Sequence, residues 1–174
     1  MSRCSQHGFA KQPEPCLRLI AGEGVEGDAH RGTTVQHLYK VRRDPTQPNL
    51  CQVHLFAVEM LAELADKGYA LGPGEIGENV LTEGFDLLAL PQGTLLYLGA
   101  EAVVKVTGLR TPCAQIDGSR AGLQKHLWGK RDAAGKRTRR AGIMGVVLTG
   151  GLVHAGESIH IKLPPAPHRP LGPV

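Results

Sequence analysis

The stretch Glu101-Ala-Val-Val-Lys-Val-Thr-Gly-Leu-Arg-Thr-Pro-Cys113 combines a strand pattern with a sharp end at a proline. Apolar residues alternate from Ala102 to Val106, which is the period of a half-buried strand. Pro112 fixes its own φ and biases the residue before it toward extended geometry, so the backbone enters Cys113 with little freedom. We therefore expect this strand to present a rigidly held thiol.

The chemistry expected of Cys113 depends on its surroundings. Arg110 lies three residues away, and a nearby guanidinium favours the thiolate, which is the form that binds soft metals and attacks carbon. The alternative is a buried cysteine that acts as a small hydrophobic residue. The sequence leaves both interpretations open.

Short apolar runs separated by Gly and Pro lie on both sides of this stretch, as in all-β domains. A helical spacing of apolar residues appears over residues 57–67, with Gly68 as its C-terminal cap. We also expect a short helix over residues 119–128, capped by Ser119. The pattern predicts a mainly β fold, a barrel or a β-dominated mixed fold, with a few short helices. The expected strands are residues 17–20, 35–41, 50–56, 94–98, 101–107, 143–149 and 157–163.

Composition narrows the possible functions. With 174 residues, of which 41% are apolar, the chain can form one domain with a substantial core. Aromatic residues make up 4%, which argues against a surface that stacks nucleic-acid bases. The formal charge of +4 permits an anionic small ligand without requiring one.

The spacing of the cysteines and the length of the apolar runs indicate in which compartment the protein is expected. Cys4, Cys16, Cys51 and Cys113 are scattered and form no CxxC pair. No secretory signal is evident near the N-terminus, and no apolar run reaches the length of a membrane span. We expect a cytoplasmic protein with reduced thiols and no membrane partner.

Two apparent motifs are weak. Gly22–Gly27 matches GxGxxG, but the residues after it do not open a helix, so we reject a dinucleotide site and expect either a surface hairpin or a phosphate-binding rim. Cys51 and His54 suggest zinc, but three-residue spacing on a strand would place them on opposite faces. The basic residues between 125 and 140 are either a solvated surface or a site for nucleic acid.

In this order and spacing, six segments resemble the MOSC family, named after the C-terminal domain of molybdenum cofactor sulfurase. The resemblance covers roughly residues 17–163. The segments are Gly24-Val-Glu-Gly-Asp-Ala-His30, Gln52-Val-His-Leu55, Pro73-Gly-Glu-Ile-Gly-Glu-Asn79, Asp86-Leu-Leu-Ala-Leu-Pro91, Thr107-Gly-Leu-Arg-Thr-Pro-Cys113 and Gly142-Ile-Met-Gly145.

The resemblance implies a closed β-barrel like the barrel domain of pyruvate kinase. Outside it, the lack of periodicity in residues 1–16 indicates a loosely held lead-in, and the prolines of residues 164–174 indicate a mobile tail. The resemblance also implies that the catalytic Cys113 binds molybdenum of the molybdopterin cofactor through its sulfur. The residues that would contact the cofactor or substrate are Asp28, His30, Arg31, Glu78, Asn79, Arg110 and Thr111.

The family implies reduction of N-hydroxylated compounds, with electrons from a separate protein because the chain has no flavin or iron–sulfur signature. The alternative is a carrier of persulfide sulfur on Cys113, supplied by a donor protein. Pyridoxal phosphate is not expected, because the chain has no room for a desulfurase domain. A third hypothesis is a cysteine hydrolase that uses Cys113 as nucleophile and His30 or His54 as base, although neither histidine has an evident orienting group in the sequence. Nucleic acid is not an expected partner.

Overall fold

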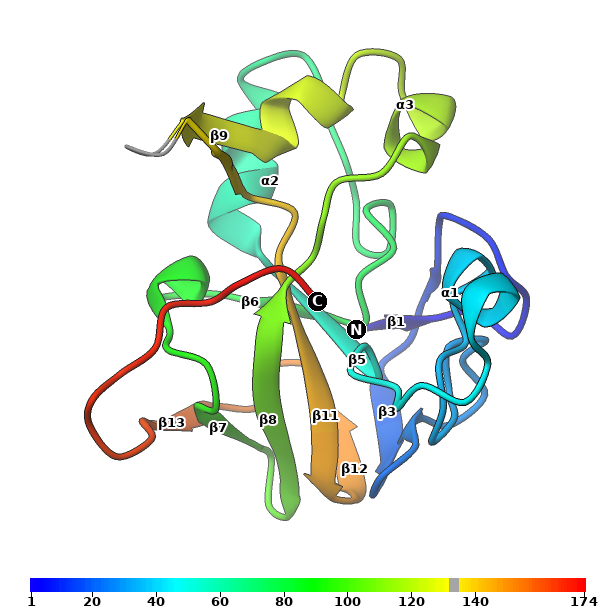
Figure 1. The fold of residues 1–174 in the computed structure, drawn as a ribbon, viewed down its shortest axis with the longest axis vertical. Helices are drawn as coiled ribbons and strands as arrows, with labels where there is room; N and C mark the ends of the chain where they lie inside the picture. The colour runs from blue at the N-terminus through cyan, green and yellow to red at the C-terminus, as the bar shows by residue number, and fades with distance from the viewer. Residues whose placement is uncertain (132–134) are drawn as a thin grey trace.

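The computed structural model describes residues 1–131 and 135–174, and its architecture is mainly β with a few short helices (Figure 1). The largest sheet has six strands, which are antiparallel except where β5 runs parallel to β6. Across the sheet the strands are β13 (Ile159–Lys162), β7 (Leu95–Leu98), β8 (Ala102–Leu109), β11 (Ile143–Thr149), β5 (Val53–Ala57) and β6 (Val80–Thr82).

The expected closed barrel is wrong. β13 and β6 are the two edges of the large sheet, and they do not pair with each other in the described part of the chain. The chain leaves this sheet after β11 and enters a second, three-stranded sheet at Gly150, where a Cβ atom would lie 2.7 Å from the carbonyl oxygen of Leu19. The second sheet consists of β12 (Gly151–His154), β3 (Cys16–Ile20) and β4 (Gly24–Val25). Switching sheets in this way leaves an open half-barrel.

One hydrophobic core joins the two sheets. Leu17 and Leu19 of β3 cluster with Leu96 of β7 and Val104 of β8, and all four are buried. The buried residues of β3 and β8 alternate along each strand, as expected for strands with one face on a core. The period-2 pattern around residue 104 is therefore confirmed.

A second core lies at the end of the large sheet where β8 ends (Figure 1). Three helical segments contribute to it: α2 (Val58–Ala65), α3 (Gln115–Ser119) and the 3₁₀ turn η2 (Gln124–Leu127). Leu64 and Ile116 are fully buried there, and Cys113 packs against the cluster. This core fixes the segment that leaves β8 toward the thiol.

The predicted helix over residues 57–67 is confirmed by α2, which is followed by Gly68 at a φ of 88°. The strand predicted over residues 35–41 is wrong, because α1 (Leu38–Arg43) is helical there. Ser119 ends α3 instead of capping a helix through residue 128. The other helical segment is the 3₁₀ turn η1 (Leu87–Ala89), and two small two-stranded sheets complete the described fold. Their strands are β1 (Ser2–Arg3) with β2 (Gln12–Pro13) and β9 (Trp128–Arg131) with β10 (Arg137–Arg139).

Both end segments contact the body of the protein. The backbone N–H of Ser2 donates to the carbonyl of Asn79 at 2.8 Å, and that of Leu109 donates to the carbonyl of Gly172 at 2.7 Å. Figure 1 shows the C-terminal segment returning to the end of β8. No helix within residues 1–131 and 135–174 is long and apolar enough to cross a membrane.

Candidate functional site

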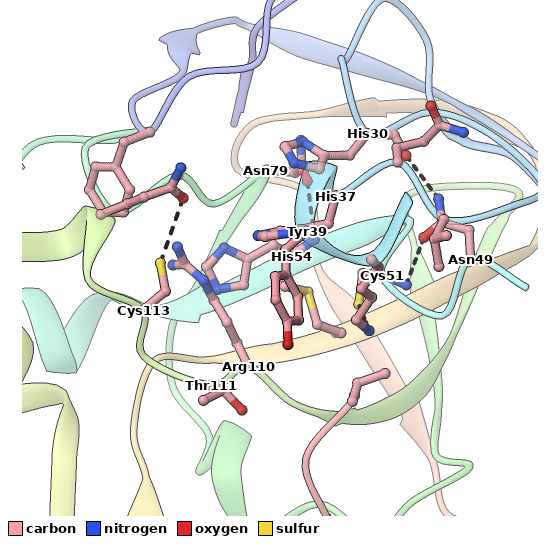
Figure 2. A pocket seen from close by; sticks show the side chains of 18 of the residues that line it. His30, His37, Tyr39, Asn49, Cys51, His54, Asn79, Arg110, Thr111 and Cys113 are labelled. Atoms are coloured by element: carbon pink, nitrogen blue, oxygen red, sulfur yellow. Dashed lines mark hydrogen bonds between the residues drawn. The ribbon is translucent and has the colours of Figure 1, made fainter. Parts of the chain in front are cut away.

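A cavity of about 340 Å³ lies beside the end of β8, and Figure 2 shows most of the side chains that line it. Its walls come from segments far apart in the sequence, including the N-terminal segment, the α1 region, β5 and the segment that follows β8. The titratable or sulfur-containing side chains on the walls are those of Lys11, His30, His37, Tyr39, Lys40, Cys51, His54, Arg110, Cys113 and Met144.

Cys113 lines this cavity and is half-buried. Its sulfur lies 3.7 Å from Oε1 of Gln115, the contact drawn as a dashed line in Figure 2. Because Pro112 stiffens the approach and the second core packs against Cys113, the sulfur has a fixed direction. Cys113 is therefore a cavity-wall thiol rather than a sealed core residue.

Arg110 lies next to Cys113 on the same wall (Figure 2). Its Nη1 donates to the carbonyl oxygen of Ile76 at 2.6 Å, and its guanidinium carbon is 5.7 Å from the centre of the Phe9 ring. Burial lowers the pKa of Arg110, while its interactions with Cys113 and Glu78 oppose that shift. No carboxylate in the described chain forms an ion pair with it.

Asp28 lies behind the cavity wall, with its side chain only 1% exposed. Its Oδ2 accepts hydrogen bonds from Nζ of Lys11 at 2.7 Å and from Nδ2 of Asn79 at 3.0 Å. Its Oδ1 accepts from the backbone N–H of His30 at 2.9 Å and lies 3.3 Å from Nδ1 of the His30 ring. Burial alone would raise the pKa of Asp28, but the hydrogen bonds from His30 and the charge of Lys11 outweigh it and lower the pKa.

Glu78 is a second buried carboxylate that does not line the cavity. It accepts hydrogen bonds from the backbone N–H groups of Gly74 and Ile76, and burial raises its pKa. Through this turn it fixes the carbonyl group that Arg110 uses. Its role in the described structure is to shape the wall.

The cavity lining is cationic. Lys11, Lys40 and Arg110 contribute to it, and the described lining contains no aspartate or glutamate. Nζ of Lys40 lies 3.9 Å from the sulfur of Cys51, a second thiol of the cavity whose pKa is raised by burial. Cationic donors without aspartate or glutamate side chains in the lining favour an anionic ligand.

Burial disfavours the charged form of two histidines of the cavity. Burial and the charge of Arg110 keep the pKa of His54 well below its usual value, and its Nε2 lies 2.8 Å from the carbonyl oxygen of Ala141. Burial followed by the nearby His30 and Lys40 lowers the pKa of His37. Neither ring has a carboxylate partner in the described structure.

The structure brings five of the predicted site residues together on the cavity wall: His30, Asn79, Arg110, Thr111 and Cys113. Asp28 and Glu78 lie behind that wall. Arg31 is not brought into the site, because its guanidinium pairs with Glu23 at 2.7 Å on the surface. The contact of these residues with a cofactor stays a prediction.

Several lining residues are absent from the sequence-based prediction, notably Phe9, Lys11, His37, Tyr39 and Lys40. The first two come from a segment interpreted as a lead-in, and the others come from a region interpreted as a strand. The helix instead places Tyr39 at the cavity while leaving it 61% exposed. The cluster of His37, Tyr39 and Lys40 in the sequence was the signal that could have indicated a binding site there.

Cys51 and His54 both line the cavity, so their expected placement on opposite faces is wrong. The reason is that Cys51 precedes β5 and does not share its alternation. The described residues still contain no group of three or more metal-ligating side chains of the His, Cys, Asp and Glu types. A zinc site has no support in residues 1–131 and 135–174.

The basic segment near residue 130 does not line the cavity. It forms the β9–β10 pair, where Arg137 and Arg139 both lie over the Trp128 ring. Nε of Arg139 donates to Oγ1 of Thr111 at 2.9 Å, which connects this pair to the cavity wall. Residues 132–134, which belong to the basic segment noted in the sequence, lie outside the described residues.

Comparison with known proteins gives one family-model match, to the MOSC domain over residues 42–160. Among solved structures, YuaD from Bacillus subtilis has a TM-score of 0.77 at 23% identity, covering 95% of this chain and 94% of that one. YiiM from Escherichia coli has a TM-score of 0.61 at 17% identity, covering 97% and 70%. YiiM from Geobacillus stearothermophilus has a TM-score of 0.60 at 18% identity, covering 89% and 65%. No curated protein sequence matches the chain.

Proposed function

The chain belongs to the MOSC domain family, and from that premise we propose that it binds the molybdenum cofactor and reduces N-hydroxylated compounds. The observation that carries the proposal is the pairing of Cys113 with Arg110 on the wall of a cationic cavity. The thiol suits a soft metal, and the guanidinium suits an anionic group on the same ligand.

The residues present fit the cofactor in chemistry. The cavity volume of about 340 Å³ falls in the usual range for small-molecule sites, about 300 to 1,000 Å³. Arg110 has no carboxylate partner among the described residues and is available for a phosphate. Cys113 supplies a sulfur ligand, and the described lining has no aspartate or glutamate side chain to repel an anion.

In this function Cys113 holds the metal, while Arg110 binds the anionic part of the cofactor. Asn79 orders the wall between them, because its Oδ1 accepts from the backbone N–H of His54 at 3.1 Å and its Nδ2 donates to Asp28. When bound, the cofactor would supply a metal centre that exchanges two electrons with the substrate. A separate redox protein would provide those electrons.

The test is to express the protein in cells that make molybdopterin and to measure metal content and pterin fluorescence. Cys113→Ala should lose the metal, whereas Cys16→Ala should keep it because Cys16 lies on β3 outside the cavity. The wild type loaded in this way should reduce an amidoxime with a chemical reductant. Equal metal content in the wild type and Cys113→Ala would contradict Cys113 as the ligand.

A second candidate function, a carrier of persulfide sulfur, is favoured by one observation. The cavity contains a second thiol, Cys51, beside Lys40, so a sulfur atom on Cys113 would share the cavity with a second thiol to which sulfur could pass. Metal-free wild type that carries labile sulfane sulfur, lost in Cys113→Ala, would support this function over the reductase.

A further inference from the structure

We propose that His30, backed by the buried carboxylate of Asp28, is the proton donor of the cavity. This inference rests on the proposed reductase function and adds a catalytic residue to it. His30 would deliver a proton from Nε2 to the oxygen that leaves the N-hydroxylated substrate. Asp28 would act through His30 as a positioning residue.

The hydrogen bonds of the ring support this assignment. Nδ1 of His30 lies 3.3 Å from Oδ1 of Asp28. The carboxylate can only accept, so Nδ1 carries a proton, and Nε2 is the nitrogen that is available to the substrate. No hydrogen bond to Nε2 of His30 occurs among residues 1–131 and 135–174. The ring lines the cavity and is 29% exposed, so it contacts both the ligand space and solvent.

Asp28 is suited to hold the ring because its own position is fixed. Lys11 and Asn79 donate to one carboxylate oxygen, and His30 uses the other. The backbone N–H of Cys4 adds a fourth donor residue at 3.3 Å. A carboxylate tied by this many donors has little freedom to reorient, so the imidazole it holds is preorganised.

The other two histidines of the cavity do not share this arrangement. His54 has its Nε2 against the carbonyl of Ala141, and burial favours its neutral form. His37 has no carboxylate partner in the described structure, and burial also lowers its pKa. The charged or titratable groups around His30 are Asp28, Lys11, which binds the other oxygen of the same carboxylate, His7, whose ring centre lies 5.3 Å away, and His37. Only Asp28 among them stabilises an imidazolium.

The reaction R–NH–OH + 2e⁻ + 2H⁺ → R–NH₂ + H₂O consumes two protons. The N–O bond breaks with its electron pair on oxygen, and that oxygen takes the proton from Nε2 of His30 to form water. The nitrogen takes two electrons, supplied ultimately by the reduced donor protein, and one proton from solvent. The exposed edge of the ring then regains its proton from water.

The decisive variant is His30→Gln, measured in protein loaded with cofactor. We expect kcat to fall about 100-fold, in the range of general acid catalysis, with metal content retained and KM changed less than about threefold. His126→Gln is the matched control, because His126 lies on η2 outside the cavity. Added imidazole should restore part of the activity of His30→Ala.

The positioning role of Asp28 has its own readouts. In cofactor-free protein, ¹⁵N NMR should show the neutral His30 ring protonated on Nδ1 in the wild type and a changed tautomer in Asp28→Asn. The double variant Asp28→Asn/His30→Gln should have the same kcat as His30→Gln alone, because Asp28 acts through that ring.

The outcomes separate this inference from the function on which it rests. Reduction by the wild type with an unchanged kcat in His30→Gln would overturn the proton role and leave the reductase function standing. No reduction by cofactor-loaded wild type would overturn both. An identical His30 tautomer in wild type and Asp28→Asn would overturn the positioning role of Asp28 even if His30→Gln is slow.

Discussion

Asp28 and Arg110 carry opposite charges at the same cavity, but the protein treats them differently. Asp28 is satisfied from inside, by Lys11, Asn79 and His30. Arg110 has a backbone carbonyl and an aromatic ring as neighbours and no carboxylate ion-pair partner in the described structure. Folding therefore supplies all the partners of the buried carboxylate of Asp28, whereas the guanidinium of Arg110 is left to pair with an anionic ligand.

Removing Asp28 should have the largest effect, because it leaves the nearly buried ammonium of Lys11, 5% exposed, without its counter-ion. We expect Asp28→Ala to lower the free energy of unfolding by about 3–5 kcal/mol, as for other broken buried ion pairs. Urea denaturation measures this change. Asp66→Ala, at an exposed position after α2, is the control, and an equal loss in both variants would contradict a special role for the buried network.

Acid should destabilise the protein in two stages. The folded-state pKa of His54 is depressed below 6.5, so the unfolded chain takes up the proton first, and stability should fall below that pH by up to about 1.4 kcal/mol per pH unit. Asp28 has a folded pKa below its unfolded value of 3.8, so its contribution is present above pH 3.8 and is lost as pH falls toward the folded value. Unfolding free energies measured from pH 7 to 2 should show both slopes. His54→Gln should remove most of the first slope and Asp28→Asn most of the second.

Arg110→Met tests the other side of the comparison. Because this variant removes a desolvated cation that has no described carboxylate partner, we expect the free energy of unfolding of the cofactor-free protein to change by about 1 kcal/mol or less. Binding of pyrophosphate, measured by calorimetry, should be lost. A large loss of stability without loss of anion binding would show that Arg110 stabilises the fold and does not bind the anion.

The smallest effect should come from the exposed ion pair of Glu63. Its carboxylate contacts Arg140 at 2.5 Å and also Lys67, and the side-chain hydrogen bond from Arg140 is the first cause that lowers its pKa to about 2. Solvent screens this group, so Glu63→Gln should change the unfolding free energy by about 0.5 kcal/mol or less. A thermal unfolding series of Glu63→Gln and Asp28→Ala would show whether burial, rather than the shift in pKa, sets the cost.

The predictable parts of the fold are those with a local pattern. The alternation of buried residues in β8 and the helical spacing in α2 follow directly from the sequence. The open half-barrel does not, because it depends on β12 leaving the large sheet and pairing with β3 across a long sequence separation. Closure of a sheet depends on such distant pairings and leaves little trace in any one segment.

The site divides in the same way. Cys113 and Arg110 were predictable because proline, thiol and guanidinium lie within four residues of one another. Lys11 was not predictable, because its role depends on a buried partner 17 residues away. The family resemblance placed Arg31 in the site, but its guanidinium pairs with Glu23 on the surface.

The cavity brings Phe9 and Lys11 against the segment that holds Cys113, more than a hundred residues later. A ligand seated there would therefore hold together parts of the chain that are distant in sequence and come apart on global unfolding. Binding restricted to the native state adds its own free energy to that of folding. The lifetime of the protein against proteases should then follow the supply of its ligand, and starvation for that ligand should lower the amount of protein as well as its activity.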